Sequence, residues 1–158
     1  MASLRFLVDT SVFARLTKPA VAAAFAPLAA GRQVALSNPV AFELGYAARS
    51  PDDYHEVADR LQSFPAVPTT DADHQRAREV QKALAAKSQH RALSLVDALV
   101  AATAEARGLA VLHYDSDFEL VAEITGQAHE WIVARGTADR DGPTIPLLEA
   151  ISCVPPAR

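Results

Sequence analysis

Short apolar runs that end in an acidic residue, and that alternate with helical segments, constrain the fold of this chain most strongly. The run 4–8 leads directly into Asp9, and the run 110–114 leads into Asp115. Short runs rich in Leu and Val are typical of buried strands, whereas the longer segments between them are typical of helices. Strands that alternate with helices predict an α/β fold with a mostly parallel central sheet.

Glycine, proline and capping residues indicate where the predicted elements begin and end. Gly31 and Gly108 are placed to end helices, and Ser37-Asn38-Pro39 is typical of a helix start. We expect strands at 4–8, 34–36, 110–114 and 131–133, and a very short one within 64–68. We expect helices at about 12–16, 20–30, 39–49, 52–62, 71–87, 95–107 and 118–124. An irregular tail follows from Gly136, with one helical turn near 147–151.

Length and composition predict one globular domain. The chain has 158 residues, of which half are hydrophobic and 22% are charged, which is enough apolar sequence for a real core. We expect a cytoplasmic protein, because no apolar run approaches the roughly 20 residues of a membrane span and no signal peptide is evident. The single cysteine, Cys153, excludes an intramolecular disulfide and a zinc site built on several thiolates.

Several acidic residues lie in apolar sequence, where local structure gives little reason for them. They are Asp9, Glu43, Asp97, Asp115 and, beside the last, Asp117. A lone carboxylate is costly to bury unless a cation meets it. Mg²⁺ and Mn²⁺ prefer carboxylate and water oxygens, and ligands of open parallel sheets collect at the carboxyl ends of the strands. We therefore expect these acids to converge on a divalent metal ion.

Local alternatives exist for some of these acids. Asp9 or Thr10 could cap the following helix, and Ser94 and Asp97 have the spacing of a capping box. Ser116 and Glu119 have the same kind of spacing, which would leave Asp117 as a first-turn acid that the helix dipole favours. Glu43 has no such alternative, because no cationic residue lies three or four positions away from it.

A metal held by carboxylates can activate water for attack on a phosphodiester, so the pattern predicts metal-dependent phosphoryl transfer. Thr10 or Ser11 could bind a metal ligand or a phosphate oxygen, although hydroxyls after a strand are also common turn and cap formers. The five acids account for more than the whole net charge of −4. A basic run from Arg76 to Arg91 could steer phosphates, or it could be an ordinary solvated helix face.

At this point the sequence resembles a PIN-domain ribonuclease, and in particular the VapC-type toxins of bacterial toxin-antitoxin pairs. The matching pieces lie in order over most of residues 4–133. They are Phe6-Leu7-Val8-Asp9-Thr10-Ser11-Val12, the mid-chain Glu43, the block from His90 to Ala104 around Asp97, and Leu112-His113-Tyr114-Asp115-Ser116-Asp117-Phe118.

The resemblance implies a three-layer α/β/α PIN-like domain over residues 1–135, with residues 136–158 as a C-terminal extension. It implies catalytic roles for Asp9, Glu43, Asp97 and Asp115, with Asp117 as a fifth acid near the metal. The metal ligands would be Asp9, Asp97, Asp115 and Asp117, with Thr10 and Ser11 at the substrate. It further implies Mg²⁺ or Mn²⁺ as cofactor, RNA as substrate, a VapB-type antitoxin and a homodimer.

Two other functions compete with this one. A catalytically silent PIN-like module would bind RNA or a partner protein, although the intact set of acids disfavours it. A haloacid-dehalogenase-like phosphatase would use Asp9 as its nucleophile and would need a second aspartate at position 11, where this chain has Ser11.

Overall fold

The computed structural model describes residues 3–138 and residue 151. In that part of the chain, strands and helices alternate as the sequence predicts. The strands are β1 (Phe6–Val8), β2 (Val34–Ser37), β3 (Ala66–Val67), β4 (Ala110–His113) and β5 (His129–Trp131). The helices are α1 (Thr10–Phe13), α2 (Pro19–Ala30), α3 (Asn38–Tyr46), α4 (Pro51–Leu61), α5 (Asp71–Ala86), α6 (Leu95–Ala106) and α7 (Asp117–Thr125).

The five strands form one parallel sheet with the order β3-β2-β1-β4-β5. Strand β1 lies at the centre and pairs with β2 on one side and with β4 on the other. Val8, the last residue of β1, is paired with Leu112 of β4, and the backbone N–H of Asp9 donates to the carbonyl of Leu112 at 2.9 Å. This register brings the acids that follow β1 and β4 to the same edge of the sheet, as the α/β prediction requires.

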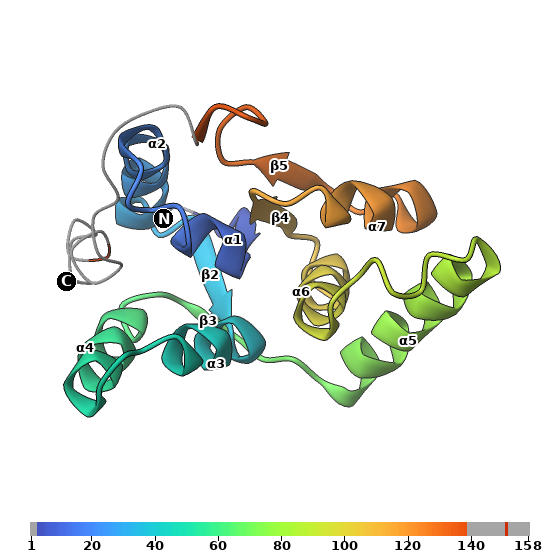
Figure 1. Ribbon diagram of the computed structural model, residues 1–158, viewed down its shortest axis with the longest axis horizontal. Helices are drawn as coiled ribbons and strands as arrows, with labels where there is room; N and C mark the ends of the chain where they lie inside the picture. The colour runs from blue at the N-terminus through green and yellow to red at the C-terminus, as the bar shows by residue number, and fades with distance from the viewer. Residues whose placement is uncertain (1–2, 139–150, 152–158) are drawn as a thin grey trace.

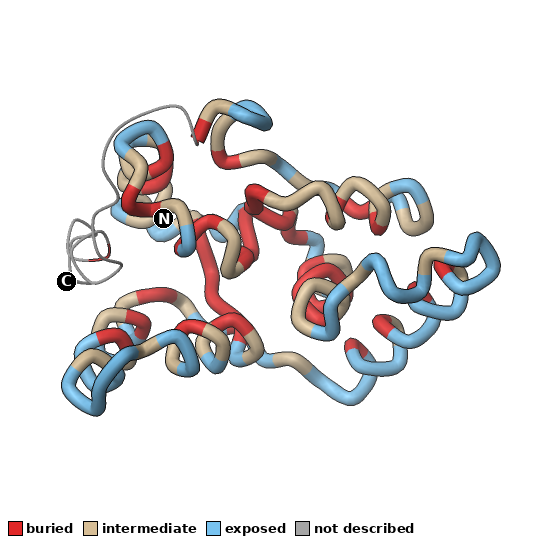
Figure 2. Tube along the Cα trace, in the orientation of Figure 1, coloured by how far each residue is buried: buried red, intermediate tan, exposed pale blue. Residues whose placement is uncertain are grey.

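Helices cover both sides of the sheet (Figure 1). Helices α5, α6 and α7 contact one another on one side, and α2 lies on the other. Buried residues follow the central strands and α6, whereas the outer part of α5 is exposed (Figure 2). The predicted three-layer arrangement is therefore confirmed. On the α2 side, the rings of Phe13, Phe25 and Phe64 pack with centroids 5.7–6.0 Å apart and anchor α1 above the sheet.

Several predicted boundaries were wrong, among them the end of the helix expected at 39–49, which stops at Tyr46. Helix α1 begins at Thr10 rather than at residue 12, because the side chain of Asp9 caps it. The last strand covers His129–Trp131 rather than 131–133. Its partner β4 ends at His113, opposite Trp131, and the chain then leaves the sheet, so no strand remains for residue 133 to pair with.

Helix α6 is held firmly at both ends, which matters because it carries Asp97. Ser94 caps its N-terminus, and Gly108 follows its C-terminus with a φ of +64°. Near that end, the guanidinium of Arg107 lies 3.0 Å from the carboxylate of Asp73 on α5, which is only 2% exposed. Removing either partner of such a buried pair would be costly, so the α5–α6 packing is well defined.

Most of the predicted C-terminal extension, including the expected helical turn near 147–151, lies outside the described residues. Of that extension, only residues 136–138 and Ile151 are described, and Ile151 is buried in the hydrophobic core. The division of the chain at residue 135 stays a prediction. Among the described residues, no helix combines the length and the apolar character that crossing a membrane requires.

Candidate metal centre

Three of the predicted acids form a compact group at the carboxyl edge of the sheet. Asp97 lies in the first turn of α6, Asp115 follows β4, and Asp117 begins α7. Each offers one carboxylate oxygen, and these three oxygens lie within 4.8 Å of one another. All three residues are partly buried. Three carboxylates this close repel one another strongly unless protons or a cation offset their charge.

Asp9 lies beside this group but is more deeply buried, at 2% exposure. Its Oδ2 accepts a hydrogen bond from the backbone N–H of Ser11 at 2.9 Å. Its Oδ1 is buried and has no hydrogen-bond partner within residues 3–138 and 151. Burial, and to a smaller extent the charge of Asp97, raises the pKa of Asp9 to about 6. This carboxyl is therefore expensive to ionise unless a cation is present.

Glu43 reaches the same region from α3. The hydroxyl of Thr10 donates a hydrogen bond to Glu43 Oε2, across 33 positions of sequence. Burial raises the pKa of Asp97, and the charges of Asp115 and Glu43 raise it further, against hydrogen bonding from Ser94. Glu43 is therefore electrostatically linked to the other acids.

Asp117 is also electrostatically linked to the other acids. Burial raises its pKa, followed by the charges of Asp115 and Asp97. Its backbone N–H also donates to Asp115 Oδ1 at 3.0 Å, which fixes the two residues relative to each other. The five acids thus share one electrostatic environment, although only Asp97, Asp115 and Asp117 form the compact group.

The local alternatives turn out to be partly correct. Asp9 caps α1, and Ser94 caps α6 by accepting from the backbone N–H of Asp97 at 3.1 Å. The predicted capping box at Ser116 is wrong. Ser116 has helical backbone angles rather than the extended ones of an N-cap, and its side chain makes no capping bond to a described residue. Glu119 instead accepts a hydrogen bond from the indole of Trp131 at 3.1 Å.

Thr10 and Ser11 both have protein partners for their hydroxyl groups. Thr10 holds Glu43, and the hydroxyl of Ser11 accepts from the backbone N–H of Tyr114 at 2.9 Å, directly before Asp115. Each hydroxyl therefore positions an acid that lies far away in the sequence. Their contact with substrate stays a prediction.

We expect Ser11→Ala to destabilise the protein by about 1–3 kcal/mol, because the backbone N–H of Tyr114 would lose its acceptor in a part-buried place. Thermal unfolding measures this effect. Ser63→Ala is the matched control, since that hydroxyl only donates to the carbonyl of Arg60 at the end of α4 and leaves no donor behind. Equal melting temperatures for the two variants would contradict this role of Ser11.

His113 supports Asp115 from behind the site. It is fully buried, and its Nδ1 accepts from the backbone N–H of Asp115 at 3.1 Å. Nδ1 is therefore the unprotonated nitrogen, and Nε2 donates to Nδ1 of His129 at 2.8 Å. Burial, followed by the charge of His129, lowers the pKa of His113 to about 4. One signal in the sequence indicates this role, namely the position of His113 two residues before Asp115.

The donor set fits a hard divalent cation. All the side-chain donors of the group are carboxylate oxygens, and the buried Oδ1 of Asp9 lacks any described partner that could offset its charge. Mg²⁺ and Mn²⁺ bind such oxygen sets, whereas zinc and copper favour nitrogen and sulfur. The group can therefore accommodate a divalent metal, and its raised pKa values make metal binding and proton release coupled events.

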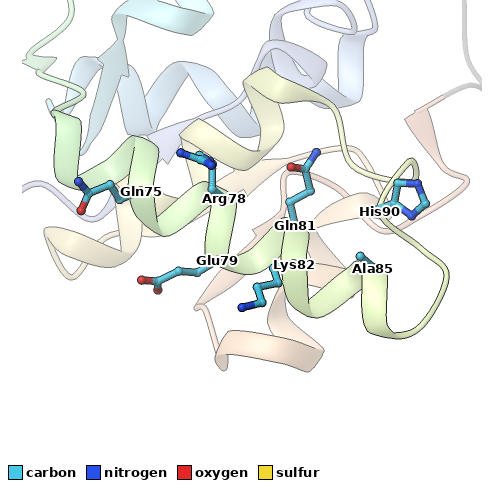
Figure 3. Close-up of a pocket in the computed structure, with 7 residues that line it drawn as sticks. All are labelled: Gln75, Arg78, Glu79, Gln81, Lys82, Ala85 and His90. Atoms are coloured by element: carbon cyan, nitrogen blue, oxygen red, sulfur yellow. The ribbon is translucent and has the colours of Figure 1, made fainter.

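The basic run on α5 does not form a second charged centre. It borders a hollow of about 720 Å³ (Figure 3), where Arg78 and Gln81 extend from one side of the helix and Glu79 and Lys82 from another. Arg76 is paired with Glu105 at 2.8 Å. Because the cations on α5 diverge and an acid lies among them, their arrangement favours the simpler of the two alternatives, a solvated helix face.

The fold and the acidic centre together define a parallel α/β protein with a group of carboxylates at the carboxyl edge of its sheet that could hold a divalent metal. The family model of the PIN domain matches residues 6–124, and this range includes all five acids. This chain belongs to the PIN-domain family.

Curated relatives match nearly the whole chain. Ribonuclease VapC51 of Mycobacterium tuberculosis is 44% identical over 137 residues, which cover 87% of this chain and 99% of the relative. Ribonuclease VapC18 of the same species is 39% identical over 134 residues, covering 84% and 98%. These relatives are named ribonucleases, which disfavours the phosphatase alternative.

Solved structures agree on the fold. The DNA-bound VapBC complex from Salmonella typhimurium contains a chain with a TM-score of 0.67 and 20% identity, over 82% of this chain and 99% of that one. VapBC2 from Rickettsia felis, bound to a DNA fragment from its promoter, gives a TM-score of 0.67 and 16% identity, over 81% and 98%. At these identities the likeness concerns the fold alone.

Proposed function

We propose that this protein is a Mg²⁺- or Mn²⁺-dependent endoribonuclease that acts as the toxin of a toxin-antitoxin pair. The observation that carries the proposal is the meeting of five acids, which follow β1 and β4 or lie on α3, α6 and α7, at one edge of the sheet. The relatives named as ribonucleases are similar over that whole region.

The surroundings of each acid indicate its role in the proposed reaction. Asp97, Asp115 and Asp117 would hold the cation, and the unpartnered Oδ1 of the buried Asp9 would be a further ligand. When bound, such a cation lowers the pKa of water and offsets negative charge on a phosphodiester. Glu43 is held by Thr10 rather than by the compact group, so its carboxylate accepts the proton of the attacking water. Thr10 and Ser11, at the N-terminus of α1, would lie beside the substrate.

The acidic centre also indicates the partner. An acidic pocket attracts guanidinium groups, so an antitoxin of the VapB type would inhibit the protein by seating an arginine among the acids. The solved complexes with similar folds are described as VapBC assemblies. We extend the proposal to a homodimer that acts in the cytoplasm, where RNA and antitoxin are both present.

Removal of divalent metal tests the proposal directly. We expect the purified protein to cut single-stranded RNA with Mg²⁺ or Mn²⁺ and to lose that activity completely in EDTA, with recovery when metal is added in excess. Cleavage is followed on a gel with end-labelled RNA. Cleavage that persists in EDTA would refute metal dependence. RNA binding without cleavage under any metal would favour the silent-module alternative.

A further inference from the structure

Two histidines form a hydrogen-bonded pair behind the acidic centre. His113 is the last residue of β4 and is fully buried, and His129 is the first residue of β5, the edge strand beside it (Figure 1). Nε2 of His113 lies 2.8 Å from Nδ1 of His129, across 16 positions of sequence. On its other side, the ring of His113 bonds to Asp115. The pair therefore connects the edge of the sheet to one of the grouped acids.

The hydrogen bonds of His113 determine its tautomer. Its Nδ1 lies 3.1 Å from the backbone nitrogen of Asp115, and a backbone N–H can only donate. Nδ1 must therefore be the acceptor, so the proton of the ring is on Nε2. A buried N–H needs an acceptor of its own, and among the described residues Nδ1 of His129 provides it. His129 consequently has its own proton on Nε2.

Packing fixes the orientation of the His113 ring. Its centre lies 5.0 Å from the centre of each of three other rings, those of Phe118, His129 and Trp131. A ring packed among others cannot turn over without displacing them, because protein interiors contain little free space. The neighbouring rings thus set the direction in which each nitrogen points, and the bond to His129 sets which nitrogen carries the proton.

The tautomer of His113 matters for the place of Asp115. Asp115 lies where the chain leaves β4, and it offers one of the three carboxylate oxygens that lie within 4.8 Å of one another. With its proton on Nδ1, His113 would direct a ring N–H at the backbone N–H of Asp115. Two donors would then face each other, and one of them would be left buried without an acceptor. Asp115 would move away from His113, and the group of acids would spread.

We propose that His129 is a positioning residue of the metal centre: by accepting from Nε2 of His113, it keeps Nδ1 of that ring available to Asp115 and so holds the Asp115 carboxylate beside the other acids. This inference rests on the proposed function, because it concerns the metal that those acids would bind. His129 acts through His113 and has no part in the reaction itself. Residues that orient metal ligands through hydrogen bonds typically change metal affinity about 10- to 100-fold.

Two variants of nearly equal shape test the proposal. The side-chain oxygen of His129→Asn can accept from His113 as Nδ1 does, whereas His129→Leu has no acceptor. We expect the dissociation constant for Mn²⁺ to rise about tenfold in His129→Leu and to stay within about twofold of the parent in His129→Asn. Asparagine is the poorer strand former, so strand propensity predicts the opposite order. Binding is followed at about pH 8 by the electron paramagnetic resonance signal of free Mn²⁺, because histidine is then normally neutral.

Nuclear magnetic resonance of the ring nitrogens reports the tautomers in the metal-free protein. In the parent we expect His113 to be protonated on Nε2 alone, and His129 to be unprotonated on Nδ1. His129→Asn should keep this pattern at His113, and His129→Leu should lose it. Both variants remove the imidazole ring, so a role of His129 in packing alone would affect them equally. Equal Mn²⁺ affinities of the two variants would overturn the proposal, as would a parent protein with the proton of His113 on Nδ1.

RNA cleavage separates this inference from the proposed function. We expect excess Mn²⁺ to restore most of the cleavage rate of His129→Leu, because all five acids are intact in that variant. A parent protein that binds Mn²⁺ but cuts no RNA would refute the ribonuclease function alone, since the comparison of the two variants needs only the metal. A parent protein that cuts RNA, with equal Mn²⁺ affinities in His129→Asn and His129→Leu, would refute the positioning role alone.

Discussion

Asp97→Asn should lower the rate of RNA cleavage by about a thousandfold or more, while the protein stays folded. Asp97 interacts electrostatically with several of the other acids. Its carboxylate belongs to the compact group, and its pKa reflects both Asp115 and Glu43. Losing one of its anionic ligands weakens the metal site, and a cost of about 4 kcal/mol in the transition state corresponds to this factor.

The fold should survive, because the Ser94 hydroxyl still accepts from the backbone N–H of residue 97, and the asparagine side chain keeps an oxygen that can accept from Ser94 as the carboxylate does. Cleavage assays and circular dichroism measure the two effects. Asp59→Asn removes the same charge from an exposed place on α4 and should be fully active. An Asp97→Asn protein with parental activity would count against the whole assignment of the centre.

Asp9→Asn should stabilise the metal-free protein by about 3 kcal/mol above pH 6, although it removes activity. The pKa of Asp9 is about 6 in the folded protein, against 3.8 for an ordinary aspartate. The folded state therefore binds a proton more tightly than the unfolded chain between these values. The contribution of Asp9 to the free energy of unfolding falls as the pH rises from about 4 to 6, and it stays low above that.

Asparagine has no charge to bury and can still accept the hydrogen bond from Ser11. We expect a melting temperature about 5–10 °C above that of the parent near neutral pH, with EDTA present, and no difference near pH 4. His113 changes stability in the opposite direction, since its pKa of about 4 makes the folded state less stable as the pH falls below about 6.5. Both proteins contain His113, so their difference isolates Asp9.

Added divalent metal should make the parent protein more stable than Asp9→Asn. A cation that binds only the folded state raises its melting temperature, and we expect Mg²⁺ or Mn²⁺ to do so in the parent and far less in Asp9→Asn. Differential scanning calorimetry with and without metal makes both comparisons. A variant that is less stable than the parent without metal at about pH 8 would show that the Asp9 charge is satisfied within the protein.

Much of this fold could be predicted from the sequence because its signals are local. The apolar run before Asp9, the proline after Asn38 and the glycine after Arg107 each mark an element boundary within a few residues. The boundary of β5 could not be found this way. Where a strand ends depends on how far its neighbour extends, and β4 ends at His113 for reasons that lie outside the β5 sequence.

The supporting contacts of the site were not predictable for a similar reason. Ser11 contacts Tyr114 across 103 positions, and Thr10 contacts Glu43 across 33. No periodicity links such pairs, since they meet only after the sheet has formed. The predicted capping box at Ser116 failed because Glu119 is drawn instead to Trp131, which is adjacent only in the folded chain.

The sequence by itself identified the acids that the fold gathers at one edge of the sheet, because a carboxylate in apolar sequence is costly to bury and is therefore recognisable from its immediate neighbours alone. It also determined the alternation of strands and helices. Only the tertiary structure decided the rest. The parallel register of β1 and β4 brings Asp9 near Asp115. The deeper burial of Asp9 raises the pKa of its carboxyl. Distance and burial are properties of the folded chain, so neither follows from the sequence alone.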